Sequence, residues 1–495
     1  MILKSVLADS VPLSSSLSKT KESIKDALYD DIPVEDFVQH VWGLGDTDVE
    51  RILDGKHYWN ISQAFLKDYK DAYGRMNENS LAARRAGNAF AAFLDIAEEV
   101  LRHIRIRIQD VIRRTNSVAF KHNSDCSNGD IPDIATVWGA ASKPEWPIIQ
   151  TMFEFERPPP LVTNNEQVID NGVFRADSFA ADSSFFKHTP SSSYASSSSS
   201  CSSSSTSCTT NASHLSGRGG SDGSGGDVVG VDGSYSRTWK RSKRRINHGE
   251  LRLAQKALEC MCSVGRRYMT GIYIDVCSVT LWYYDRMSII RSRSFNFEQS
   301  PAYLVLVLYA ITRCGVYQSG YDQFHEFPNT PFGIQLPTTN HKGSRLVIPT
   351  PGASYCFQMT RDKPIYVSRE LTGRGTMVYP VILQPDEDEV IVTEEEQVFK
   401  MYWPNVDDPL EADTIKRLHH DVPEIADHIP SISFSASFTG DELDLPSSRL
   451  KAYGGLTREE RLLHMFTMKR YEKLWEVDSI EEFQEVFLDC VECKQ

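Results

Sequence analysis

Apolar side chains recur at helical spacing through the first part of the chain. Between Leu81 and Ile106 they fall three or four residues apart, which is typical of a helix with one buried face. Residues 20–115 as a whole are predicted to be mostly helical. Two short strands are expected next, over Ala135–Trp138 and Pro147–Phe155, and a run of three prolines ends the second.

Regular patterns return near residue 249, first mixed and then rich in strands. The first group comprises helices over Leu253–Cys262 and Pro301–Thr312, and strands over Thr270–Asp275, Ser278–Asp285 and Ile289–Phe295. The second group comprises strands over Leu346–Ile348, Cys356–Met359, Pro364–Tyr366, Met377–Val381, Glu389–Val392, Val398–Trp403, Ser431–Phe438 and Leu462–Met468. One helix is expected before Ser431 and a last one over Ile480–Cys493. The predicted fold class is therefore α+β.

Composition divides the chain in its middle. Ser191–Thr210 is almost all serine, and Gly217–Gly233 is rich in glycine and serine. Such sequence buries too little apolar area to offset the entropy lost on ordering, so we expect a disordered, low-complexity insertion. The predicted organisation has three parts. An α/β module comprises residues 1–165 and 246–345, the insertion between its two halves comprises 166–245, and a second domain comprises 346–495.

Charge and cysteine content narrow the class of protein. The formal net charge of −14 makes nucleic acid an unlikely partner over the whole surface. The basic run Lys240–Arg245 fits a nuclear import signal, an anion-binding patch or a solvated charge run, and these alternatives stay open. No segment approaches the roughly 20 apolar residues that cross a bilayer, and Met1–Ser18 lacks the apolar core of a signal peptide. We expect a cytoplasmic or nuclear protein.

The ten cysteines show no metal-site spacing, so no metal ligand is predicted.

Two stretches carry motifs of one known family. The first runs from Gln255 to Phe297 and contains a helix and then a strand pair with an aromatic-Asp-Arg turn at Tyr284-Asp285-Arg286. The second contains Gly373-Arg374-Gly375, then Val398-Phe399-Lys400, then Glu411-Ala412. In this order and spacing they resemble the fungal-type protein kinase family of mushroom-forming fungi. The resemblance covers roughly residues 30–495 apart from the insertion.

The resemblance implies a nucleotide site in an amino-terminal kinase lobe. A kinase needs backbone amides over the phosphates, a strand lysine that holds them and a helix glutamate that orients the lysine. The matching residues are Gly373, Gly375, Val378, Lys400 and Glu411, and ATP and magnesium are the implied cofactors. Taken singly, the glycines also fit a simple turn and the lysine a solvated strand end.

The sequence departs from the family pattern in ways that bear on activity. The third glycine of the phosphate loop is absent, and the acidic stretch Asp386–Glu396 lies between loop and lysine. The only His-x-Asp triplet, His419-His420-Asp421, is followed by Pro423 and is expected to end a helix rather than to supply the catalytic base. No Asp-Phe-Gly for magnesium follows before Gln495. We therefore predict no catalytic residue and weak nucleotide binding. A carboxyl-terminal lobe lost by gene-model truncation, or present elsewhere, stays open.

The upstream module carries a second resemblance. Pro132-Asp133 before a strand, Glu154-Phe155-Glu156 at the end of the next, and then a helix with Gln255 resemble the restriction-endonuclease-like core. There an Asp and a Glu bind magnesium, and a lysine two residues past the Glu activates water. Glu156 stands in place of that lysine. The resemblance implies a degenerate site at Asp133, Glu154 and Glu156 without nuclease activity; an unrelated α/β fold stays open.

Two functions from different classes therefore compete. The first is an ATP-dependent Ser/Thr protein kinase. The second is a non-catalytic pseudokinase that binds a protein partner or a chaperone. An apolar stripe on the predicted helix Ile480–Val491 favours a partner surface there. Nucleic-acid binding through Lys240–Arg245 is a third and weaker alternative.

Overall fold

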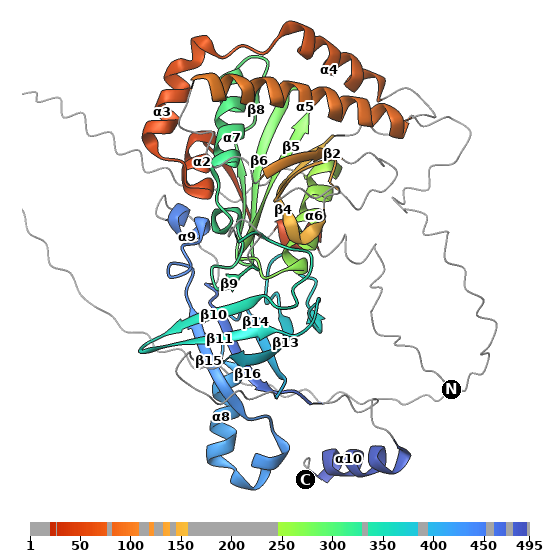
Figure 1. Ribbon diagram of the computed structural model, residues 1–495, viewed down its shortest axis with the longest axis vertical. Coiled ribbons are helices and arrows are strands. Elements are labelled where there is room, and N and C mark those ends of the chain that lie inside the picture. Colours follow the sequence, from red (N-terminus) through yellow and green to blue (C-terminus); the bar gives the residue numbers. More distant parts are fainter. Residues whose placement is uncertain are drawn as a thin grey trace, which may run out of the picture. The chain divides into compact units, whose positions relative to one another are not determined.

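The described part of the chain contains two eight-stranded sheets, with helices packed on them, and a further helix at its carboxyl-terminal end (Figure 1). The structure is a computed structural model, and it describes residues 20–25, 27–76, 82–107, 118–122, 132–138, 145–156, 246–328, 335–384, 395–451, 460–471 and 479–492. The predicted insertion, the basic run and the strand expected over Glu389–Val392 lie outside these ranges. Both sheets belong to one compact unit, formed by residues 1–166 and 236–495. Within the described ranges, no helix has the length and apolar character needed to span a membrane.

The first sheet is mixed. Its strands run in the order β1 (Leu28–Ile32), β7 (Ile289–Ser292), β6 (Ser278–Asp285), β5 (Tyr268–Asp275), β4 (Ile149–Phe155), β3 (Ile134–Trp138) and β2 (Val118–His122), and β8 (Phe295–Asn296) pairs with β6. The pairs β1–β7 and β4–β5 are parallel, and the others are antiparallel. Strand β1 lies in a stretch that was predicted to be mostly helical. The sequence analysis missed it because the strand with which it pairs, β7, is remote in sequence.

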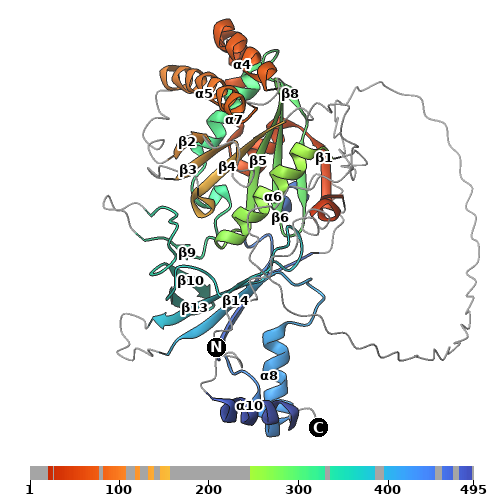
Figure 2. The same ribbon diagram turned by 90° about the vertical axis from the view of Figure 1, so that its right-hand side faces the viewer.

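Helices cover both faces of this sheet (Figure 2). The large core on one face includes α2 (Val34–Trp42), α3 (Asp46–Asp54), α4 (Gln63–Arg75), α5 (Ala82–Arg107) and α7 (Pro301–Arg313). Helix α6 (His248–Ser263) packs on β4 and β5 from the other face. Along β6, Leu281 and Tyr283 join the first core, whereas Trp282 and Tyr284 join the α6 core. Burial on both faces explains the nearly continuous apolar sequence of these strands.

The upstream elements follow the order helix, three strands, helix, strand. Helix α5 precedes the antiparallel β2, β3 and β4, and α6 then crosses over to β5, which lies parallel to β4. The order predicted from the sequence had two strands between the helices, and β2 is an additional strand that the sequence analysis missed. The restriction-endonuclease-like core stays a prediction.

The second sheet is antiparallel throughout. Its order is β15 (Ile432–Phe438), β16 (Leu463–Lys469), β14 (Gln397–Tyr402), β13 (Met377–Gln384), β11 (Ala353–Met359), β10 (Arg345–Thr350) and β9 (His325–Glu326), and β12 (Tyr366–Val367) pairs with β13. Helix α8 (Glu411–Asp421) follows β14, α9 (Pro446–Lys451) precedes β16, and α10 (Ile480–Glu492) comes last. Short 3-10 turns lie at Gly55–Tyr58, Trp146–Ile148, Tyr317–Ser319 and Pro423–His428. Because β9 joins this sheet, the sheet begins earlier than the predicted boundary at residue 346.

The two faces of β14 have different surroundings. Phe399 and Met401 belong to the large hydrophobic core. Tyr402 points to the opposite face and packs with Ala412 of α8 and Phe466 of β16. Since side chains alternate along a strand, Lys400 shares the face of Tyr402. This alternation brings the predicted lysine to the side of the sheet on which α8 lies.

Candidate functional site

A lysine and a glutamate form an ion pair between β14 and α8. Lys400 Nζ lies 2.8 and 2.6 Å from the two carboxylate oxygens of Glu411. The Lys400 side chain is 21% exposed and that of Glu411 is 40% exposed. The pairing predicted from the sequence is therefore present, and it is accessible from solvent.

Neighbouring aromatic residues hold this pair in place. Lys400 stands in register between Val378 on β13 and Phe466 on β16. Its Nζ lies 5.4 Å from the ring centroid of Tyr402 and 5.6 Å from that of Phe466, within the range of a cation–π contact. The Tyr402 hydroxyl accepts the Glu411 N–H at 3.0 Å, which satisfies one of the amides left unpaired at the start of α8.

The glycines lie in the connection from β12 to β13, residues 368–376, called here the glycine loop. Gly373 has φ +119° and Gly375 has φ +47°, values that favour glycine. The Ser368 N–H donates to the Thr376 carbonyl at 2.7 Å and closes the loop. The Trp403 N–H donates to the Arg374 carbonyl, also at 2.7 Å, so the loop is attached to the end of the lysine strand.

The predicted upstream carboxylates have separate partners. Glu154 is fully buried and accepts hydrogen bonds from Arg252 Nε at 2.6 Å and from Lys256 Nζ. Burial alone raises the pKa of the Glu154 carboxyl, but Lys256 and Arg252 together hold that pKa below its usual value. Asp133 accepts the Phe155 N–H at 2.9 Å, and Glu156 accepts the Tyr273 hydroxyl.

Glu154 therefore belongs to an ion cluster with two cations, whereas Asp133 and Glu156 have other partners. Among the described residues, no three His, Cys, Asp or Glu side chains are gathered as ligands of a metal ion would be. Lys256 was not singled out from the sequence. Its spacing of four residues from Arg252 places both cations on one face of α6, and this is the signal that the sequence contained.

The other predicted features fall outside the lysine–glutamate pair. His419, His420 and Asp421 are the last residues of α8, as predicted, and His419 Nε2 lies 2.9 Å from the Pro430 carbonyl. Most of the acidic stretch lies outside the described residues. Its end is ion-paired: Glu395 lies 3.3 Å from Lys469, and Glu396 contacts Arg470.

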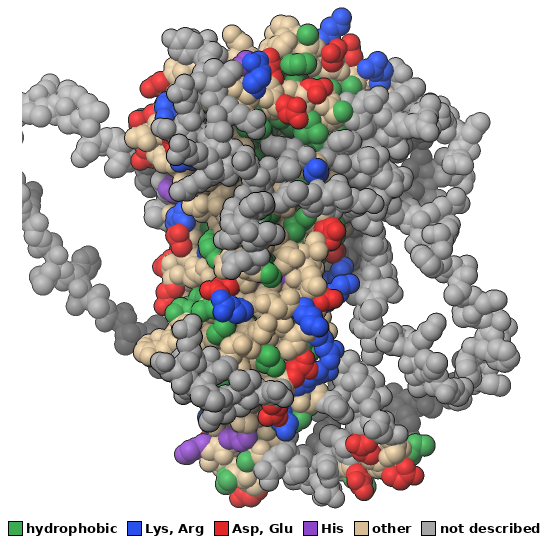
Figure 3. All heavy atoms as spheres, viewed as in Figure 1, with side chains coloured by type: hydrophobic (Ala, Val, Ile, Leu, Met, Phe, Trp, Pro, Cys, Tyr) green, Lys and Arg blue, Asp and Glu red, His purple; other side chains and the backbone are tan. Residues whose placement is uncertain are grey.

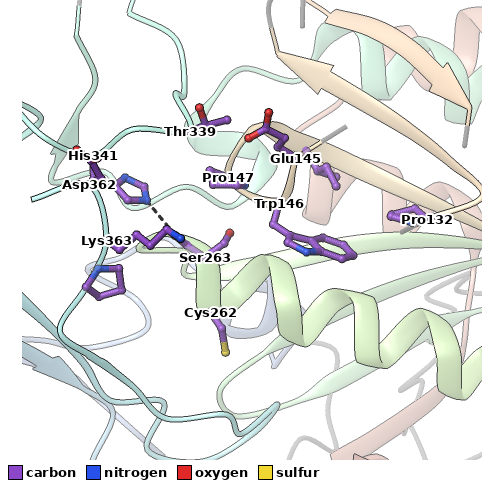
Figure 4. Close-up of a pocket in the computed structure, with 12 residues that line it drawn as sticks. Pro132, Glu145, Trp146, Pro147, Cys262, Ser263, Thr339, His341, Asp362 and Lys363 are labelled. Carbon is purple, nitrogen blue, oxygen red and sulfur yellow. Dashed lines mark hydrogen bonds between the residues drawn. The ribbon is translucent and has the colours of Figure 1, made fainter. Parts of the chain in front are cut away.

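A cavity of about 480 Å³ lies apart from the nucleotide-site residues (Figure 4). Trp146 and Pro147 line it from the first sheet, Ser263 from the end of α6, and His341 and Lys363 from the second sheet's loops. His341 Nε2 lies 2.9 Å from the Ser263 carbonyl, and burial lowers the pKa of this histidine. Neither Lys400 nor the glycine loop contributes to its lining, so the cavity is not the predicted nucleotide site.

Comparison with known proteins identifies a family. Residues 235–437 match a family model described as fungal protein kinase. The matched stretch contains α6, the β6–β7 turn, the glycine loop, Lys400 and Glu411, and it confirms the family predicted from the sequence. Asp133, Glu154 and Glu156 lie outside it. No curated protein and no solved structure matches the chain.

Proposed function

Since this chain belongs to the fungal protein kinase family through residues 235–437, we propose that its second sheet binds the ATP of a Ser/Thr protein kinase reaction. The observation that carries the proposal is the ion pair of Lys400 and Glu411, with oxygens 2.6 and 2.8 Å from Nζ. In kinases this pair orients the lysine toward the nucleotide phosphates, and a glycine-containing loop covers them. The glycine loop leads directly into β13, whose Val378 is the cross-strand neighbour of Lys400.

Each part of the site has a proposed role. Lys400 neutralises phosphate charge, Glu411 fixes the direction of the lysine, and the backbone around Gly373 and Gly375 approaches the phosphates. Val378 offers an apolar contact to the nucleotide from the neighbouring strand. ATP supplies the transferable phosphoryl group when it is bound. Among the described residues, no three His, Cys, Asp or Glu side chains lie together as ligands of a magnesium ion would.

We propose that residues 1–495 bind nucleotide weakly and do not transfer phosphate by themselves. Within this sequence the His-x-Asp triplet ends α8, as described above, and no Asp-Phe-Gly follows it. Positioning and charge neutralisation supply nearly all of the catalysis in phosphoryl transfer, and in kinases both depend on the catalytic Asp of such a triplet and on the metal-binding Asp.

Calorimetric titration with MgATP tests the proposal. We expect a dissociation constant of roughly 1 mM. Lys400→Met should weaken binding about tenfold, which corresponds to about 1.4 kcal/mol. The matched control is Lys416→Met, which removes an amine from α8 whose bond is to Ser435 Oγ. Equal MgATP affinity of Lys400→Met and the wild type would refute the placement of the nucleotide site at Lys400. A micromolar dissociation constant for the wild type would refute the proposal that binding is weak.

For the upstream module we propose a structural role without nuclease activity. The buried ion cluster supports this structural role, because the Glu154 carboxylate already pairs with two cations, Lys256 and Arg252. Incubating the chain with DNA and either Mg²⁺ or Mn²⁺ should give no cleavage. Metal-dependent cleavage that Glu154→Ala abolishes would contradict this role.

A second candidate function, partner binding, is favoured by α10. Figure 3 shows acidic and apolar side chains together over this helix. The exposed apolar side chains are Ile480 (72%), Phe483 (39%), Phe487 (51%) and Leu488 (56%). An exposed apolar stripe of this kind suits an apolar groove on a protein partner or a chaperone. This function does not need ATP, so nucleotide binding that depends on Lys400 separates it from the first proposal.

A further inference from the structure

The β6–β7 turn, Asp285–Ser288, has a fixed shape and is buried. Asp285 is fully buried, and its carboxylate accepts the N–H groups of Met287 at 2.7 Å and Ser288 at 2.5 Å. The other carboxylate oxygen accepts the hydroxyls of Tyr283 and Ser447. Since the turn is fixed from both sides, the residue at its tip, Arg286, has a defined position.

Arg286 joins this turn to the glycine loop. Its carbonyl accepts the Gly373 N–H at 2.9 Å, and its Nη1 donates to the Glu370 carbonyl. Its Nη2 donates to the Met261 carbonyl of α6 at 3.2 Å. One residue of the first sheet therefore binds both the first sheet's helix and the loop of the second sheet.

The approach of the loop to Arg286 explains the second glycine. A Cβ on Gly375 would lie 2.4 Å from Arg286 Nε and 2.6 Å from Cζ. Such distances are below any real Cβ contact, and φ of +47° adds strain for other residues. Gly375 thus allows the loop to rest against the guanidinium group.

The electrostatics of Arg286 favour a nearby anion. The residue is 1% exposed, and its Nε has no hydrogen-bond partner. In the described ranges it forms no ion pair with a carboxylate; its guanidinium donates to backbone carbonyls and also lies beside the Cys262 thiol. A buried cation without a counter-charge is unfavourable, so negative charge bound on the loop above it is stabilised.

The contact occupies one amide of the loop, and the next three amides have no acceptor among the described residues. The Gly373 N–H is occupied by the Arg286 carbonyl. The N–H groups of Arg374, Gly375 and Thr376 donate to no described residue. Consecutive free amides held in one conformation are suited to binding phosphate oxygens.

We propose that Arg286 is a positioning residue for nucleotide binding, which fixes the glycine loop so that the amides of residues 374–376 meet the phosphates in a preset geometry. This inference rests on the proposed function. A loop that is already ordered loses less entropy when it binds its ligand, so affinity gains from the contact. Through Arg286, the first sheet thereby fixes the conformation of the phosphate-binding loop of the second sheet.

Two readouts test the proposal in the full chain: hydrogen exchange of the Gly373 amide and affinity for MgATP. Arg286→Ala keeps the main-chain carbonyl that accepts the Gly373 N–H but removes the Nη1 bond to the Glu370 carbonyl. The loop should therefore open more often, which speeds the exchange and weakens binding about tenfold. Arg286→Lys should restore part of both, because its amine can replace one of the two donated hydrogen bonds. Arg293→Ala is the matched control; that arginine is 58% exposed and pairs with Asp31, so neither readout should change.

A second variant approaches the contact from the loop side. Gly375→Ala should reproduce both effects in the wild-type background, because its Cβ displaces the loop from Arg286. In the Arg286→Ala background it should add little, since the atoms it meets are gone. Unchanged exchange of α7 amides verifies that each variant folds.

The outcomes separate this inference from the proposed function. If the wild type binds no MgATP, the proposed function fails. If the wild type binds MgATP but Arg286→Ala speeds exchange without weakening binding, the positioning role fails alone. Equal effects of Gly375→Ala in both backgrounds would also overturn it.

Discussion

Glu154 carries its charge in the core of the first sheet, with Lys256 and Arg252 beside it. Lys256→Met should destabilise the protein by about 3 kcal/mol, because removing one partner leaves buried charge less compensated. Urea unfolding monitored by tryptophan fluorescence measures this free energy.

The double variant Glu154→Gln/Lys256→Met controls for packing. It removes both charges of the pair, so its cost should be smaller than the sum of the two single variants by about 1–3 kcal/mol. Strict additivity would show that the two groups do not interact in solution.

His325 gives the fold a predicted pH dependence. It is fully buried against Phe327, with ring centroids 4.4 Å apart, and neither ring nitrogen has a partner. Burial, with a smaller effect of His341, lowers the pKa of His325 to about 3. Because the unfolded pKa is about 6.5, the unfolded chain takes up the proton first as pH falls. The stability contributed by neutral His325 is complete above pH 6.5 and is lost toward pH 3.

The measurement compares the wild type with His325→Phe at two pH values. Between pH 7 and pH 5 the wild type should lose about 2 kcal/mol of unfolding free energy relative to the variant. Parallel pH curves for the two proteins would show that His325 is protonated equally in the folded and unfolded states.

The residues of the lysine–glutamate pair were predictable, whereas their surroundings were not. Lys400 and Glu411 stand eleven residues apart on a predicted strand and the helix after it, and the family resemblance implied their pairing. The Arg286 contact to Gly373 joins segments that are remote in sequence and has no local signal. The partners of Glu154 escaped prediction for the same reason, since Lys256 follows far along the chain.

At the scale of elements, α10 is predicted to be weakly protected. Ser479 Oγ accepts the Glu482 N–H at 3.0 Å, which gives the helix the amino-terminal cap predicted from the sequence. Its described apolar side chains are nevertheless exposed, and a helix of 13 residues without tertiary packing is marginal in water. Hydrogen exchange of residues 480–492 should therefore be close to that of an unfolded peptide.

Helix α7 is an internal control for α10. It also has 13 residues, but nine of them are buried in the first sheet's core. Its amides should exchange slowly in the same experiment. Slow exchange in α10 at low protein concentration would show that its stripe is already covered, which would contradict the prediction.

Most elements were predictable because their apolar periodicity is local. The predicted strands of the second sheet that lie in the described ranges are found near their expected bounds, and α5, α6 and α7 match their predicted helices. Strand β1 was missed because its five residues become a strand only by pairing with β7. The same limitation applies to β9, a two-residue strand that pairs with β10.

At the scale of the whole molecule, polar contacts connect the two sheets. Arg267 of the first sheet's region donates to the Leu443 carbonyl, and Ser447 of α9 donates to Asp285. Arg286 adds the contact to the glycine loop. The proposed nucleotide site is therefore supported by a module that lies upstream of it in sequence.

The most direct test of the proposed site is to locate the lysine that lies beside bound ATP phosphates. An acyl phosphate derivative of ATP transfers its acyl group to such an amine, forming an amide and releasing ATP, and mass spectrometry identifies the modified residue. We predict acylation of Lys400 that excess MgATP suppresses, while Lys469, which is 61% exposed on β16, reacts equally with or without ATP. ATP-insensitive labelling of Lys400, or ATP-protected labelling of another lysine instead, would contradict the account.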